Sequence, residues 1–359
     1  MSGYRVAVVG ATGLVGQEII RCLEQRKFPC SSLRLFTADR SASREPLLPQ
    51  REPAVEGLSN SAFDEADLVF FAAGMDVARQ FAPLAIKAGA VVVDSSPAWR
   101  IDPDVPLIVP EVNTAEVRAH KGLVAGPEST VVALTMALYP LHRVNPLKQV
   151  VVCTYESVSG AGRAAQEELS AQARLVLEGR TVVPHVFPHQ IAFNVLPEVD
   201  IFLDNGYSRG EWSLVEETRK VLRAEGLPIS ATCARVPVYV GHAVAVHAEF
   251  SNPIAPEDAR KLLVESPGVR VLDDPDVSLY PQPWFASGSD DVLVGRIRRD
   301  ASNSSALSMW VVIDNLRKGA ALNVVQIAEE LARQGHIPEG GKRHGQVGTP
   351  SDSHGDPVH

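Results

Sequence analysis

The feature that most constrains the fold is a glycine-rich turn that joins an apolar strand to a helix near the start of the chain. The β-branched run Tyr4–Val9 leads into this turn, and a helical stretch follows over Gln17–Gln25. Glycines let the backbone turn tightly and approach a pyrophosphate, while the N-terminus of the following helix offers free N–H groups to the phosphates. The pattern predicts a dinucleotide-binding turn whose contacts come from Gly10, Thr12, Gly13, Leu14, Val15 and Gly16.

A second predicted strand, Leu33–Thr37, ends where such domains choose between NAD and NADP. Arg40 and Ser41 can hold a 2′-phosphate by charge-assisted hydrogen bonds. Asp39 can instead accept from a free ribose hydroxyl and repel the phosphate. We expect NADP, with NAD as the alternative because of Asp39; a plain solvated loop is the remaining interpretation.

Strands and helices continue to alternate after this point. Strands are expected at Asp67–Phe71 and Ala90–Val93, with a helix at Asp76–Ala88 between them. Alternation of this kind predicts a parallel sheet that binds ligands at the carboxyl ends of its strands. Gly74 and Ser95, which follow two of the strands, are therefore expected to face the cofactor.

The second half of the chain is patterned differently. Its later strands alternate and are rich in β-branched residues, which predicts a mixed or antiparallel sheet; they are expected at Ala231–Val240, Val244–Phe250, Val292–Arg298 and Ser308–Ile313. The fold class is thus α/β, with a Rossmann-type dinucleotide-binding domain and an α+β domain for substrate binding and dimerisation. The expected limits are 1–130 with 317–336 for the first domain, 131–316 for the second, and 337–359 for a disordered tail.

Composition excludes several classes of function. The net charge is −9 over 359 residues, and the chain lacks the clustered Lys and Arg that nucleic-acid binding requires. No run of about 18 apolar residues predicts a membrane span, and the start of the chain lacks a secretory pattern, so a cytoplasmic protein is expected. The four cysteines contain no CxxC pair, and we expect neither disulfides nor a metal site.

Several further motifs together resemble the aspartate-semialdehyde dehydrogenase family over nearly the whole chain. Beyond the glycine turn, the segments that carry the resemblance are 94–100, 109–113, 187–194, 204–207, 235–238, 241–242 and 314–321. The resemblance implies an NADP-dependent enzyme that interconverts L-aspartyl-4-phosphate and L-aspartate 4-semialdehyde in lysine, threonine and methionine biosynthesis. It also implies a homodimer or homotetramer whose only other partner is a small aspartyl-type substrate.

Carried over residue by residue, the resemblance assigns roles to five positions. Arg100 resembles the arginine that binds phosphate, and Arg235 the clamp for the substrate carboxylate, a role that suits a planar bidentate donor. His242 resembles the general acid/base, and Glu211 the acid that contacts the substrate amino group. Asn315 lies in the segment that closes over the nicotinamide.

The same comparison shows departures from the family pattern. The family has Asn-Pro-Asn-Cys-Ser-Thr where this chain has Gly126-Pro127-Glu128-Ser129-Thr130, so the nucleophilic cysteine is absent. Glu156 stands in place of the family's glutamine, and Ser213 in place of a lysine that assists phosphate. Ser129 is the nearest replacement hydroxyl, but serine needs an adjacent base to act as a nucleophile.

Three hypotheses remain open from the residues. The chain is a working acyl-phosphate reductase with another nucleophile, in which Ser129, Glu156 and His242 are the candidate catalytic residues. Alternatively, it is a catalytically silent relative that keeps NADP and ligand binding. In the third hypothesis it is a thiol-independent NAD(P)H carbonyl reductase, with His242 as the proton donor.

Overall fold

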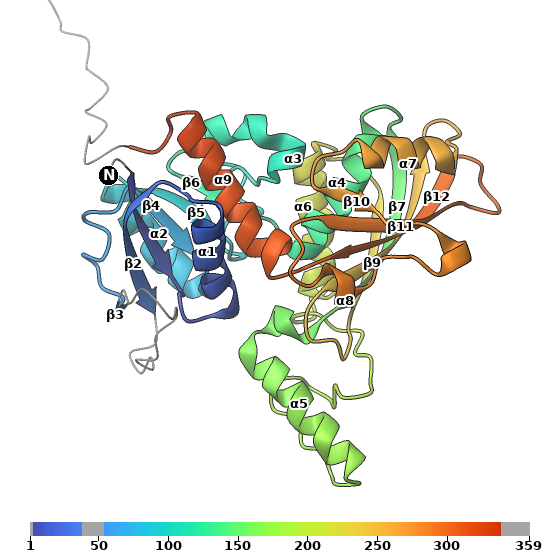
Figure 1. Ribbon diagram of the computed structural model, residues 1–359, viewed down its shortest axis with the longest axis horizontal. Coiled ribbons are helices and arrows are strands. Elements are labelled where there is room, and N and C mark those ends of the chain that lie inside the picture. Colours follow the sequence, from blue (N-terminus) through green and yellow to red (C-terminus); the bar gives the residue numbers. More distant parts are fainter. Residues whose placement is uncertain (1–2, 38–53, 339–359) are drawn as a thin grey trace, which may run out of the picture.

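The computed structural model describes residues 3–37 and 54–338, which form two β-sheets that lie side by side with helices packed on them (Figure 1). Asp39, Arg40 and Ser41, the residues expected to select the cofactor, lie outside the described residues. Within the described part, no helix is long and apolar enough to cross a membrane.

The first sheet is parallel throughout, in the order β3-β2-β1-β4-β5-β6. Its strands are β1 (Tyr4–Val9), β2 (Cys30–Thr37), β3 (Val55–Gly57), β4 (Leu68–Phe71), β5 (Val91–Asp94) and β6 (Leu123–Ala125). Alternate residues of β1 pack on opposite faces: Val6 and Val8 join the core under α1 (Leu14–Gln25) and α9 (Leu322–Arg333), and Ala7 and Val9 join the core under α2 (Met75–Lys87). Helices on both faces explain why these strands are continuously apolar.

The second sheet is mixed, in the order β10-β11-β12-β9-β7-β8. Its strands are β7 (Leu147–Glu156), β8 (Ile229–Arg235), β9 (His242–Phe250), β10 (Val269–Val271), β11 (Val292–Arg299) and β12 (Ala306–Ile313). The inner face packs on α4 (Ser129–His142), α6 (Arg209–Leu222) and α7 (Pro256–Val264). The predicted fold class, with a parallel and a mixed sheet, is confirmed.

Short elements complete the described chain. They are α3 (Pro110–Asn113), α8 (Pro283–Ala286), the 3₁₀ turns η1 (Thr114–Ala119), η2 (Val158–Ala161) and η3 (Pro275–Val277), and the π-helical turn η4 (Arg317–Ala321). The longer α5 (Arg163–Leu177) extends away from the second sheet (Figure 1).

Two predicted elements have different limits in the structure. The strand expected over Ala231–Val240 ends at Arg235, where β8 loses its pairing with β7. Pro237 has no amide hydrogen to continue a ladder, and the Val238 amide bonds back to Val236, which forms a turn. Ile337 is buried at 3% exposure in the core of the first sheet, so packing continues one residue into the predicted tail; the limits of the domains stay predictions.

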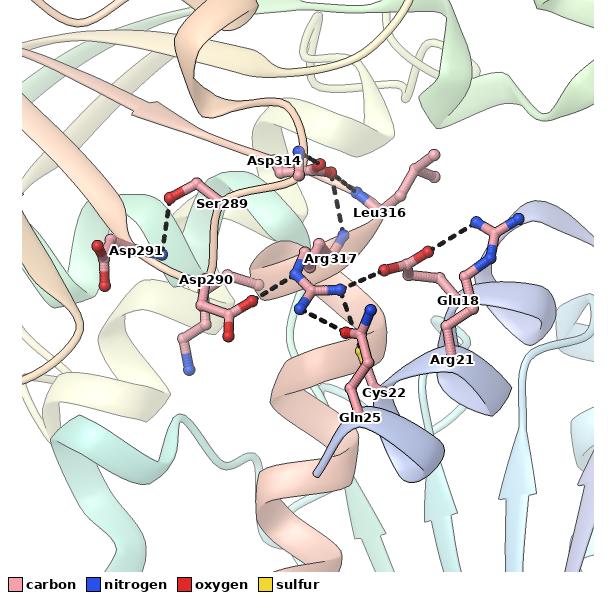
Figure 2. A network of polar contacts seen from close by, with 12 residues as sticks. Glu18, Arg21, Cys22, Gln25, Ser289, Asp290, Asp291, Asp314, Leu316 and Arg317 are labelled. Carbon is pink, nitrogen blue, oxygen red and sulfur yellow. Dashed lines mark hydrogen bonds and ion pairs between the residues drawn. The ribbon is translucent and has the colours of Figure 1, made fainter. Parts of the chain in front are cut away.

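Arg317 joins the two halves of the molecule (Figure 2). Its guanidinium donates to Glu18 Oε1 at 2.7 Å and to Gln25 Oε1 at 2.8 Å, both on α1, and it also pairs with Asp290 in the loop before β11. The Arg317 amide donates to Asp314 at the end of β12. One side chain therefore links helix α1 of the dinucleotide-binding half to the loop before β11 of the mixed sheet.

Candidate functional site

A cavity of about 430 Å³ receives side chains from both halves of the molecule. The first half contributes Val15, Ser95, Pro97 and Arg100; the 126–130 loop and α4 contribute Pro127, Glu128 and Ser129; the mixed sheet and its connections contribute Glu156, Ser159, Gly160, Ala161, Val199, Asp200, Arg209, Gly210, Ser213, Arg235, His242, Asn315, Leu316, Gly319 and Ala320. The structure thus brings together eight of the predicted site residues: Val15, Ser95, Arg100, Ser129, Glu156, Arg235, His242 and Asn315.

The loop before α4 lines this cavity without a sulfur atom. Helix α4 begins at Ser129, which makes Glu128 its N-cap residue, and the Glu128 amide donates to Glu217 Oε2 at 2.8 Å. None of the four cysteines lines the cavity. Cys153 lies on the opposite face of β7 from Glu156, as strand alternation predicts, and the Cys233 thiol is buried with a raised pKa.

Ser129 is not activated as a nucleophile. In the described part of the chain its hydroxyl has no imidazole or carboxylate as a hydrogen-bond partner, and its Cβ lies against Gly319, where an added Cβ would come within 2.6 Å. A serine needs an adjacent general base to attack a carbonyl carbon.

His242 is held as a neutral imidazole at the start of β9. Its Nδ1 accepts the Ser157 amide at 3.1 Å, so the ring proton of the neutral form sits on Nε2. Burial, together with the nearby Arg235 guanidinium, lowers the pKa of His242 to about 3. The ring can donate a hydrogen bond from Nε2 but carries no positive charge at neutral pH.

Arg235 and Glu156 pair at the ends of two neighbouring strands. β7 and β8 run parallel in register, so Glu156 lies opposite Arg235, and the Arg235 Nη1 to Glu156 Oε2 distance is 3.4 Å. Arg235 Nη1 also donates to the Ser157 carbonyl at 2.9 Å, and the Thr154 hydroxyl donates to Glu156 at 3.0 Å. Burial raises the pKa of Glu156, and Arg235 opposes this rise.

Arg100 is fixed from the other side of the cavity. Its Nε and Nη2 donate to the carbonyls of Gly126 at 3.1 Å and Ser95 at 2.8 Å, and its Nη1 lies 3.6 Å from Glu217 Oε1. Glu217 is 1% exposed, and burial raises its pKa. The sequence patterns did not single out Glu217, although its spacing from Leu214 and Val221 places it on the buried face of α6.

Asn315 and Gly160 shape the floor of the cavity. Asn315 Oδ1 accepts the Gly241 amide at 2.9 Å and the Ser159 hydroxyl at 3.2 Å, which fixes the segment that leads into His242. A Cβ at Gly160 would lie 2.7 Å from Arg235 Nη1 and 3.2 Å from His242 Nε2. A side chain at position 160 would therefore displace Arg235 or His242.

The structure does not bring Glu211 into the cavity. Its carboxylate accepts the Ser208 amide at 2.7 Å in a capping box at the start of α6, and it accepts the Cys233 amide at 3.0 Å. Gly210 and Ser213, three residues apart on one face of α6, line the cavity instead. The helix phase that turns these two positions inward turns Glu211 toward its cap.

The glycine turn has the geometry that a dinucleotide needs. Gly10 has φ of +83°, and a Cβ there would lie 2.4 Å from the Ala72 carbonyl oxygen. A Cβ on Gly16 would lie 2.2 Å from the Gly10 carbonyl oxygen. Gly13 is the N-cap residue of α1, and no side chain caps this helix, so its first amides are available to phosphate oxygens.

The two other predicted cofactor contacts lie at the carboxyl edge of the same sheet. Gly74 is the N-cap residue of α2, and the Ser95 hydroxyl donates to the Phe71 carbonyl at 2.8 Å. Among the described residues, no group of three or more His, Cys, Asp or Glu side chains is placed to hold a metal ion. The donor set fits a phosphate-bearing organic cofactor and an anionic ligand.

Comparison with known proteins decides the family. The NAD-binding domain of semialdehyde dehydrogenases matches residues 5–120, and the dimerisation domain of the same enzymes matches residues 138–318. The aspartate-semialdehyde dehydrogenase of Aquifex aeolicus is 45% identical over 339 residues, which cover 93% of this chain and all of that protein. The chain belongs to the aspartate-semialdehyde dehydrogenase family.

Other members of the family agree in sequence and in structure. The Bacillus subtilis enzyme is 42% identical, with 92% of this chain and 98% of that enzyme covered. The crystal structure of aspartate semialdehyde dehydrogenase II from Vibrio cholerae superimposes with a TM-score of 0.89 at 37% identity, covering 92% of this chain and 99% of that chain. The matches establish an oxidoreductase scaffold of amino-acid biosynthesis with a domain for a nicotinamide cofactor.

Proposed function

We propose that this family member binds a nicotinamide dinucleotide and a small anionic ligand between its two halves, and that it does not catalyse the phosphorylating oxidation of L-aspartate 4-semialdehyde. The observation that carries the proposal is the thiol-free loop: Glu128 and Ser129 line the cavity, and all four cysteines lie elsewhere. Covalent acyl transfer needs an activated nucleophile at this point. Removal of such a nucleophile costs roughly 10⁴ or more in rate.

Retained binding groups support the ligand-binding half of the proposal. Arg100 and Arg235 remain at the cavity, and the glycine turn keeps the form that accepts a pyrophosphate. We propose NADP as the dinucleotide, on the basis of Arg40 and Ser41 in the sequence. The structure of a Candida albicans aspartate semialdehyde dehydrogenase with NADP, at 25% identity and a TM-score of 0.71, supports this choice.

The alternative of thiol-independent carbonyl reduction is weakened by the state of His242. A proton donor for the carbonyl oxygen is most effective when its pKa lies near the working pH. The pKa of His242 is lowered to about 3, so its cationic acid form is absent at neutral pH. The proposed general acid is therefore a weak one, and we favour the silent ligand-binding protein.

We also propose that the chain forms a homodimer through the outer face of the mixed sheet. Helix α8 covers one end of this face, and beyond it Val151 is 39% exposed and Tyr155 is 38% exposed. The rings of Tyr155 and Trp310 contact each other at a tilt of 44°, with centroids 5.3 Å apart, and Trp310 lines a hollow of about 610 Å³. An apolar face of this kind in the family's dimerisation domain suits a second copy of the chain.

The test is a paired assay on the purified protein. NADPH and NADH binding are followed by fluorescence, and semialdehyde oxidation is measured with phosphate beside an active family enzyme as a positive control. We expect dinucleotide binding without turnover. The variant Glu128→Cys restores a thiol to the loop and is expected to keep NADPH binding and to gain phosphate-dependent turnover.

Two results would contradict the proposal. Turnover by the unaltered protein that matches the positive control would show that another nucleophile acts. Failure to bind either dinucleotide would remove the ligand-binding function. A Ser129→Ala variant distinguishes the nucleophile in the first case, because loss of activity would identify that hydroxyl.

A further inference from the structure

The cavity holds more carboxyl groups than cations to pair with them. Glu217, just behind the lining, pairs with Arg100 at 3.6 Å, Glu156 pairs with Arg235 at 3.4 Å, and Asp200 pairs with Arg209 at 3.4 Å. The fourth acid, Glu128, lines the cavity, and its carboxyl has no hydrogen-bond or ion-pair partner within the described ranges 3–37 and 54–338. Its backbone amide is already bonded to Glu217.

Charge balance determines what the unpaired carboxyl does. Four ionised carboxylates against three guanidinium groups would leave one uncompensated negative charge in a poorly solvated space, which is costly. The neutral His242 ring offers no cation to balance it. Burial and the neighbouring carboxylates Glu156 and Glu217 raise the pKa of Glu128 to about 8, so this group is largely protonated at neutral pH.

The groups around Glu128 also limit what can lie beside it. Arg100 has its Nε and Nη2 on backbone carbonyls and its Nη1 near Glu217. Within the described chain Arg235 uses only Nη1, so its Nε and Nη2 are available to a ligand carboxylate. From α6 the cavity receives the uncharged Ser213 and Arg209, whose guanidinium already pairs with Asp200 at 3.4 Å.

We propose that Glu128 determines the ligand class of this site, which is a short organic acid. The Glu128 carboxyl donates a hydrogen bond to a carboxylate or carbonyl oxygen of this acid, and Arg235 holds the acid's other carboxylate. The inference rests on the proposed ligand-binding function of the same cavity. Two carboxyl oxygens that share one proton attract, whereas two carboxylates repel. Anion binding therefore requires the proton on Glu128, and a phosphate dianion is disfavoured next to Glu128 and Glu156.

The test uses succinate as the probe and isothermal titration calorimetry between about pH 7 and pH 9, where both succinate carboxylates are ionised. Binding favours protonated Glu128, so affinity is expected to be nearly full at about pH 7 and about tenfold lower at about pH 9. Titrations near pH 9 in buffers of different ionisation enthalpy should show that the protein takes up close to one proton when succinate binds. Inorganic phosphate is expected to bind at least about tenfold more weakly than succinate near pH 8.

Two variants separate the mechanism from a general charge effect. Glu128→Gln keeps a hydrogen-bond donor that does not titrate, so succinate affinity should become independent of pH from about 7 to about 9. Glu216→Gln is the matched control: it makes the same Glu-to-Gln change on α6, at a residue that pairs with Arg219 and does not line the cavity. Its succinate affinity should fall with pH as in the wild type. Circular dichroism and NADPH binding report whether each variant is folded.

Each contrary result has a distinct meaning. A pH-independent affinity in the wild type, absence of proton uptake, or an unchanged slope in Glu128→Gln would overturn the role of Glu128. Phosphate that binds as tightly as succinate would overturn the selectivity. A protein that binds NADPH but not succinate near pH 7 would overturn this inference alone, whereas loss of NADPH binding would overturn the proposed function. If Glu128→Gln does not fold, the proton count on the wild type still decides the question.

Discussion

Replacement of Lys318 by methionine should strongly destabilise the protein, because it breaks a buried ion pair. Lys318 is 0% exposed and lies in the π-helical turn between β12 and α9. Its Nζ donates to Glu111 Oε2 at 2.7 Å, to Gln326 Oε1 at 2.7 Å and to Asn323 Oδ1 at 3.3 Å. In Lys318→Met, the Glu111 carboxylate, 12% exposed, keeps only the Gln326 amide at 3.0 Å.

The expected loss follows from the contacts that remain. Removal of one partner of a buried ion pair costs about 3–5 kcal/mol, since the other charge is left uncompensated. Burial lowers the pKa of Lys318, which shows that the folded state already bears a desolvation cost that methionine removes. We therefore expect the lower end, about 3 kcal/mol, and a thermal midpoint lower by about 6–12 °C.

The assay is urea and thermal unfolding followed by circular dichroism. Lys121→Met is the matched control, because Lys121 and its partner Asp104 are both 73% exposed, and its midpoint should not change. Adding Glu111→Gln to Lys318→Met should cost less than the sum of the single changes, by about 0.5–3 kcal/mol. A loss below about 1 kcal/mol in Lys318→Met would refute the assignment of this pair as a buried electrostatic contact.

Three further predictions concern other parts of the structure. Gly16→Ala, whose Cβ would lie 2.2 Å from a carbonyl oxygen, should weaken NADPH binding by about tenfold or more in a fluorescence titration. Gly226→Ala, with no atom within 4 Å, should bind NADPH normally, and equal affinities of the two variants would contradict the close packing of the turn. Arg317→Ala should lower the free energy of unfolding by about 1–3 kcal/mol in urea, because it releases the contacts between α1 and the mixed sheet, and an unchanged midpoint would show that these contacts contribute nothing. Tyr155→Asp should shift the protein from dimer to monomer in sedimentation velocity, and a dimer that persists would place the interface elsewhere.

Local patterns were sufficient for much of the scaffold. The glycine turn from Gly10 to Gly16 and the alternation of apolar strands and helices predicted the parallel sheet, because chain geometry over a few residues determines both features. The prediction that β8 continues to Val240 was wrong, because the strand ends at Arg235. A β-branched composition indicates extended backbone, but pairing with a neighbouring strand determines where the strand ends.

Motifs in the sequence predicted part of the candidate site. Motifs identified Arg100, Arg235 and His242, and the structure gathers them around one cavity with Glu156. Glu211 could not be placed by its motif, since the phase of α6 turns its carboxylate to the helix cap. One residue along a helix rotates a side chain by about 100°, and sequence resemblance does not measure that rotation.

The sequence by itself determined the family, the two-sheet architecture and the absence of a thiol in the 126–130 loop, because each is written in the order of residues along short segments. Only the tertiary structure decided the charge state of the site. Glu128, Glu156 and Glu217 come from three separate parts of the chain, and their pKa values rise because folding removes them from water; for Glu128 the nearby Glu156 and Glu217 carboxylates add to the rise. Solvation and distance are properties of the folded protein, so the pKa of Glu128 is raised only after α4, α6 and β7 have packed together.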